Sequence, residues 1–86
     1  MEDKRTIPFA GTPLVAGCIL VATDDVGDAN LWEIVRVYDN GRCDACCPFN
    51  RAMTNTFLVE LGVGEWVGPD LPSVLSYLRL MGIEAK

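Results

Sequence analysis

The pattern of apolar and polar residues predicts extended strands over most of the chain. The apolar run from Leu14 to Ala22 is rich in β-branched and small residues, and its length fits a buried central strand. Periodicity alone does not separate such a run from a buried helix segment. The polar residues 23–30 that follow are typical of a loop.

Residues 31–38 form a second predicted strand. Regular alternation would put Leu31, Glu33, Val35 and Val37 on one face, and Trp32, Ile34, Arg36 and Tyr38 on the other. Both faces are mostly apolar, so we expect at least part of each to be covered. Asn40-Gly41 then predicts a two-residue hairpin turn with positive φ at both positions. The returning strand would span residues 42–47, because Pro48 cannot donate to a ladder.

The following segment predicts one further strand with an uncertain extension. Residues 48–53 are interpreted as a loop or a single helical turn, and residues 54–61 as a strand. Residues 62–69 either continue that strand through a bend or form a short separate strand. Their three glycines favour a bend or bulge.

The C-terminal segment predicts a helix over residues 71–81. Asp70 is a suitable N-cap, and Pro72 falls in the first turn. Gly82 occupies the position of a left-handed C-cap, from which Ile83 could close back on Leu78. An apolar stripe runs along the helix; it consists of Leu71, Val74, Leu75, Leu78 and Met81.

These elements predict a mainly β protein of the α+β class. We expect a small curved antiparallel sheet, or an open barrel similar in architecture to SH3-like barrels, with about four strands and one C-terminal helix. That architectural similarity implies no activity. Residues 1–9 are interpreted as a flexible N-terminal arm, and residues 10–86 as one compact domain.

Charge narrows the classes of partner. The 86-residue chain has a net charge of −5, and residues 24–44 contain six acidic residues against two arginines, a local net of −4. An acidic chain without a Lys/Arg cluster is poorly suited to bind nucleic acid directly. A basic protein partner fits better. The alternative is that these carboxylates lie in solvated turns and keep the protein soluble.

The cysteines suggest a second class of function. Cys43, Cys46 and Cys47 include one C-x-x-C spacing, which occurs in zinc sites and redox pairs. A zinc site would also need Cys18 and a carboxylate such as Asp44, because the chain has no histidine. On an alternating strand, Cys46 faces away from Cys43 and Cys47. The alternative, which we favour, is that Cys18, Cys43 and Cys47 are small buried apolar residues in a reducing cytoplasm.

Catalysis and membrane insertion are disfavoured. Without histidine, the two serines, Ser73 and Ser76, have no common general base. No apolar run approaches the roughly 18–20 residues of a membrane span, and no hydrophobic signal region follows the charged N-terminus. We therefore predict a cytoplasmic, non-enzymatic protein without a cofactor or a metal ion.

The resulting hypothesis is a protein-interaction module. In size and composition the chain resembles small proteins of phages and mobile elements, including inhibitors of host proteins. A chain this short buries only about 63 % of its surface on folding, so some apolar residues should stay exposed and join two copies into a homodimer. The candidate partner-binding residues are Asp24, Asp25, Asp28, Trp32, Tyr38, Trp66 and Tyr77. For Trp32 and Trp66 the alternative is packing in the core.

Overall fold

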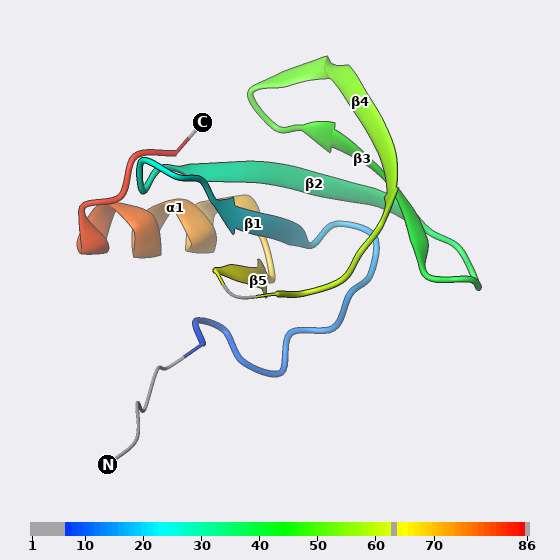
Figure 1. The fold of residues 1–86 in the computed structure, drawn as a ribbon, viewed down its shortest axis with the longest axis horizontal. Coiled ribbons are helices and arrows are strands. Elements are labelled where there is room, and N and C mark those ends of the chain that lie inside the picture. The colour runs from blue at the N-terminus through cyan, green and yellow to red at the C-terminus, as the bar shows by residue number, and fades with distance from the viewer. Residues whose placement is uncertain (1–6, 63, 86) are drawn as a thin grey trace.

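The fold is one open antiparallel sheet with a helix on one of its faces (Figure 1). The computed structural model describes residues 7–62 and 64–85. The elements within them are β1 (Ile19–Thr23), β2 (Ala29–Val37), β3 (Arg42–Cys47), β4 (Asn50–Leu58), β5 (Glu65–Gly68) and α1 (Leu71–Met81). The strand order is β4-β3-β2-β1-β5, so β4 and β5 form the two edges. The predicted mainly β class is confirmed, and β5 is the short separate strand that the sequence left as one of two options.

The sheet buries an apolar core on each face. The first core lies under α1 and consists of Ile19, Val21, Ala29, Leu31, Trp66, Val74 and Leu78. The second core lies on the opposite face and consists of Cys18, Leu20, Ile34, Cys43, Ala45 and Val67. Leu14, which precedes β1, and Val59, in the connection from β4 to β5, pack against the second core. The two faces are therefore covered by different parts of the chain: α1 covers one, and irregular segments help to cover the other.

The helix has the predicted bounds and the predicted caps. The Asp70 carboxylate accepts a hydrogen bond from the Ser73 N–H at 2.8 Å, and Gly82 adopts a φ of 73°. The Ile83 N–H donates to the Leu78 carbonyl at 2.9 Å, which completes the C-cap. Of the predicted stripe, Val74 and Leu78 are buried, whereas Met81 is 55 % exposed. The stripe therefore ends one turn before the helix does. Among the described residues, no helix has the length and the apolar content that crossing a membrane requires.

The first strand is shorter than the sequence predicted. The apolar run 14–22 was expected to be extended throughout, but β1 begins only at Ile19. Before it, the Cys18 N–H donates to the Val15 carbonyl, and Gly17 has a φ of 99°. The local turn reverses the chain, so apolar character alone overestimated the strand.

Two details of the β2–β3 hairpin also differ from prediction. A bulge between Ile34 and Arg36 shifts the register, so Val37 lies opposite Cys43 of the second core rather than on the face of Leu31. Gly41 has a φ of 88°, but Asn40 does not have a positive φ. The closing bonds are Gly41 N–H to Tyr38 O and Tyr38 N–H to Arg42 O. The connection is thus a three-residue loop with glycine in the left-handed position, not the two-residue turn that was predicted.

The strand β4 is displaced toward the N-terminus relative to prediction. It spans Asn50–Leu58 rather than 54–61, so the loop predicted over residues 48–53 is wrong from Asn50 onward. The register shifts between Cys46 and Cys47, which leaves residues 51–53 outside the regular pairing. Regular pairing resumes at Thr54 and continues to Leu58.

Candidate interaction surface

The predicted partner-binding aromatics lie in three separate places. Trp66 is buried in the first core, and Tyr77 and Phe9 pack against it with ring centroids 5.5 and 5.8 Å away. Trp32 lies on the opposite face of the sheet, in edge contact with Phe57 at 5.9 Å. Tyr38 is in the β2–β3 hairpin and is 38 % exposed. The aromatic residues therefore do not form one surface. Of the predicted arm, residues 1–6 lie outside the described residues, whereas Phe9 contacts the first core.

Tyr38 belongs to a polar cluster on the helix-facing side of the hairpin. Its hydroxyl donates to one oxygen of Asp44 at 2.6 Å, and the Thr56 hydroxyl donates to the other oxygen at 2.7 Å. These two hydrogen bonds hold the pKa of Asp44 below its ordinary value, and the first raises the pKa of Tyr38. The guanidinium of Arg36 lies 5.1 Å from the centre of the Tyr38 ring. The cluster ties β2, β3 and β4 together through side chains.

The acidic loop between β1 and β2 is organised by one of its own carboxylates. Asp24 accepts hydrogen bonds from the Val26 and Asp28 N–H groups at 3.1 and 3.0 Å, and from the Asn30 side chain at 3.3 Å. Asp25 is exposed. In the strand order, β2 and β3 separate β1 from β4. The predicted contact between this loop and a partner remains a prediction.

The cysteines do not converge on one point. All four are free thiols, and burial raises the pKa of Cys18 and Cys43 in the second core. Cys46 is also buried, and Cys47 is half-buried. Within residues 7–62 and 64–85, no group of three or more Cys, Asp or Glu side chains is placed to hold a metal ion.

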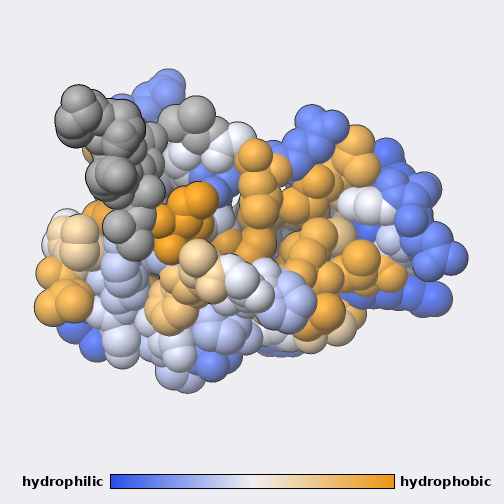
Figure 2. Space-filling model, turned by 90° about the horizontal axis from the view of Figure 1, so that it is seen from below, coloured by the Kyte–Doolittle hydropathy of each residue, from blue (hydrophilic) through white to orange (hydrophobic). Residues whose placement is uncertain are grey.

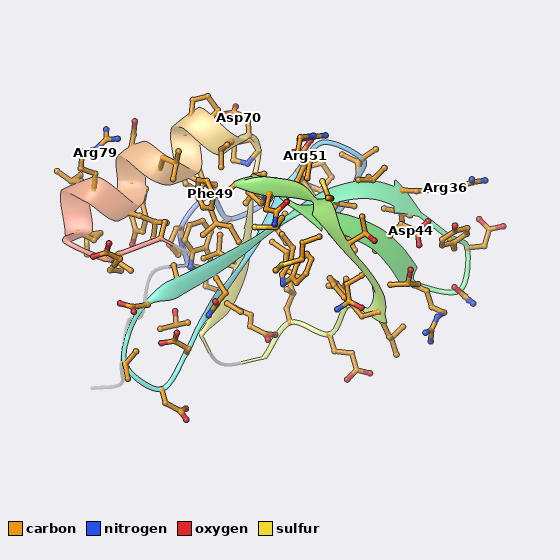
Figure 3. The ribbon with its side chains drawn as sticks, turned by 90° about the horizontal axis from the view of Figure 1, so that it is seen from above. Arg36, Asp44, Phe49, Arg51, Asp70 and Arg79 are labelled. Atoms are coloured by element: carbon orange, nitrogen blue, oxygen red, sulfur yellow. The ribbon has the colours of Figure 1, made fainter. Side chains whose placement is uncertain are left out.

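The edge strand β4 is long and mostly exposed. Eight of its nine residues are exposed, and Arg51 is its single charged residue. The other edge, β5, has four residues, of which three are buried. Native sheets usually protect a long edge with charges, proline or bulges, because its open backbone groups can pair with another chain. In β4, the charged Arg51 (Figure 3) and the bulge fall within residues 51–53. This leaves Thr54–Leu58 regular and uncharged.

The hydrogen bonds of the neighbouring strands show which backbone groups of β4 are open. The Ile34 N–H donates to Cys18 O, and the Ile34 carbonyl accepts from Gly17, so the Ile34 backbone faces the β1 side. Ala45, opposite Ile34, must then direct its N–H and C=O toward Asn55 of β4. Along a strand, successive residues direct their N–H and C=O groups toward alternate neighbouring strands. The N–H and C=O groups of β4 that point away from β3, and are open in the sense of having no partner strand, are therefore those of Thr54, Thr56 and Leu58. Of these, the Thr56 N–H donates to the Asn55 side chain at 2.9 Å.

Apolar side chains border this edge. Phe57 of β4 packs against the second core. Leu58, on the other face of the sheet, is 48 % exposed. At the opposite end of the strand, Phe49 and Met53 are each about half exposed (51 and 52 %). A hollow of about 230 Å³ opens there, lined by Met53, Trp32 and Cys47 together with Asn30 and Leu31. The edge thus combines open backbone groups with apolar contact area.

A second apolar area lies on the underside of the molecule (Figure 2). It covers the face where residues 7–17 and the connection from β4 to β5 run, and its exposed residues include Val15 and Leu61. This area offers side chains to a partner, whereas the β4 edge also offers hydrogen-bonding backbone groups.

Sequence reasoning did not identify β4 as an interaction surface. It assigned residues 54–61 to a strand, but strand order along a sheet is set by tertiary pairing. The available signal is the run Thr-Asn-Thr-Phe-Leu at residues 54–58, which has strand-forming residues and no charge.

No protein-family model, curated protein or solved structure matches this chain.

Proposed function

We propose that this protein is a non-enzymatic protein-interaction module that binds its partner by adding a strand to β4. The observation that carries the proposal is the regular, uncharged edge Thr54–Leu58 with three residues whose backbone groups are open. Strand addition gives affinity through main-chain hydrogen bonds and specificity through alternate side chains. Phe57 and Leu58 supply such side chains on the two faces.

The rest of the chain supports a binding rather than a catalytic role. There is no histidine, and Ser73 lies in the first turn of α1, where the capping Asp70 carboxylate accepts a hydrogen bond from its N–H. The acidic surface expected to attract a basic host protein lies around Asp25, away from β4. An inhibitor role on such a protein would use that loop as a second point of contact, with electrostatic attraction speeding association.

The proposal is tested with Thr54→Pro. Proline is tolerated on an edge strand where its N–H would face solvent, so the substitution removes an open donor and leaves the β3–β4 ladder in place. The tagged wild-type chain and the Thr54→Pro chain are used to capture proteins from the same host extract. Ser76→Lys, on the exposed face of α1, is the matched control.

We expect one partner to be retained by the wild type and by Ser76→Lys, and to be lost with Thr54→Pro. Hydrogen exchange of the complex should then show protection of the Thr54, Thr56 and Leu58 amides. Equal capture by all three chains, or protection elsewhere only, would contradict strand addition at β4.

A further inference from the structure

We infer that the strand added to β4 is β4 of a second copy of this chain, paired antiparallel about a two-fold axis at Thr56. The inference rests on the proposed function, because it names the partner that uses the same edge. A two-fold axis makes such a contact self-complementary, so one surface on each copy is sufficient.

The register follows from the open backbone groups. With the axis at Thr56, Thr56 lies opposite Thr56 of the second copy, and Thr54 lies opposite Leu58 of the second copy. All three residues with open N–H and C=O groups then face one another, as hydrogen-bonded pairs require. Moving the axis to Thr54 would instead place Leu58 opposite Asn50, beyond the irregular residues 51–53. The Thr56 N–H now donates a hydrogen bond to the Asn55 side chain at 2.9 Å. In the dimer it would instead donate to the Thr56 carbonyl of the second copy.

The side chains at the edge match in the same register. Phe57 lies opposite Asn55 of the second copy, so the two Phe57 rings become diagonal neighbours, roughly 7–8 Å apart and within reach of one another. Phe57 already contacts Trp32, and both pack against the second core. Pairing would therefore join the second cores of two copies into one continuous apolar face.

Charge favours a second copy over a basic partner at this edge. Residues 54–58 carry no charge, and the carboxylate of Asp44, on the neighbouring strand, is held by Tyr38 and Thr56. Across the proposed axis, the two Asp44 carboxylates would be three strand spacings apart, about 14 Å. That distance exceeds the screening length of roughly 8–10 Å at physiological salt, so the net charge of −5 opposes the contact only weakly.

The solution mass of the full chain tests the inference. Sedimentation equilibrium across the micromolar range should give twice the chain mass of 9.4 kDa, falling to 9.4 kDa in Thr54→Pro and unchanged in Ser76→Lys. A dimer that persists in folded Thr54→Pro would overturn the inference, because another surface would then join the copies.

A cysteine cross-link tests the register without proline. In a hydrogen-bonded antiparallel pair the Cα atoms are about 5.5 Å apart, a separation that a disulfide spans. Thr56→Cys in a Cys47→Ser background, oxidised with diamide, should give a covalent dimer in high yield. Ser76→Cys in the same background should give no covalent dimer. Equal cross-linking of the two variants would contradict the proposed axis.

The two proposals fail in different ways. A wild-type mass of 9.4 kDa at all concentrations overturns the second copy as the partner but leaves strand addition by another protein open. Capture of a host protein that is lost with Thr54→Pro would then identify the occupant of the edge. A monomer whose captured proteins are unaffected by Thr54→Pro overturns both.

Discussion

Gly68, the last residue of β5, lies directly against Val74 of α1. A Cβ atom built on Gly68 would come within 2.2 Å of the Val74 Cγ2 atom, although the backbone of Gly68 is otherwise ordinary. Val74 is fully buried and so has no solvent-facing space into which to move. The absence of a side chain at residue 68 is therefore what lets the helix approach the sheet edge.

Gly68→Ala is expected to destabilise the protein through this contact. Overpacking in a well-packed core costs about 1–3 kcal/mol, and urea denaturation measures the loss. Gly62→Ala is the matched control, because Gly62 also lacks a positive φ and a Cβ there would come no closer than 3.8 Å to another atom. Equal denaturation midpoints for the two variants would show that α1 does not pack on β5 as described.

The loss of unfolding free energy caused by Leu→Ala substitutions along α1 should increase with the burial of the leucine. Leu78 is 2 % exposed, so Leu78→Ala should cost about 2–5 kcal/mol of unfolding free energy. Leu75 is only half-buried, and Leu75→Ala should cost less. Leu80 is 82 % exposed, and Leu80→Ala should stay within about 0.5 kcal/mol of the wild type. Chemical denaturation of the three variants checks the order, and a reversal would mean that the helix is rotated about its axis.

In the hairpin loop, Gly41 should contribute more to the free energy of unfolding than Asn40. Gly41→Ala should cost about 1–2 kcal/mol, since it forces a side chain into the left-handed region. Its Cβ would also lie 3.3 Å from Leu58. Asn40→Ala should cost about 1 kcal/mol at most, because it removes only the hydrogen bond from the Arg42 N–H at 3.0 Å. Thermal melts that rank Asn40→Ala as the worse variant would instead support the two-residue turn.

The Tyr38–Asp44 hydrogen bond should make stability depend on pH. The bond favours the ionised carboxylate, so the pKa of Asp44 is lower in the folded chain than its ordinary value of 3.8. Its contribution is present above the unfolded pKa and is lost as the pH falls through the folded pKa. Tyr38→Phe removes the donor and should flatten the decline in unfolding free energy between pH 5 and the acid limit, as measured by urea denaturation.

Two further measurements bear on the same bond. Tyr77→Phe is the control, because the Tyr77 ring packs against Trp66 rather than near Asp44, and it should leave the acid decline unchanged. In wild type, the raised pKa of Tyr38 means that the contribution of its protonated form is lost as the pH rises through that pKa. A tyrosine absorbance titration of Tyr77→Phe, which keeps Tyr38 as the only phenol, should show ionisation above the ordinary tyrosine value of 10.0. Ionisation at that ordinary value would place Tyr38 away from Asp44.

The sequence by itself determined the elements whose signals are local. The helix needs only the cap at Asp70, the left-handed Gly82 and the spacing of Val74 and Leu78, all within 13 residues, and its bounds were predicted to the residue. The strand 42–47 was equally local, bounded by Gly41 and Pro48. In both cases neighbouring residues supply the hydrogen-bond partners or block the alternatives.

The tertiary structure decided everything that depends on distant partners. The bulge after Ile34 and the burial of Trp66 both follow from which elements lie alongside, and periodicity does not specify a neighbour. The edge position of Thr54–Leu58 has the same origin. An alternating strand carries the same side chains in the middle of a sheet or at its margin, and only the pairing order leaves one row of backbone groups without a partner strand.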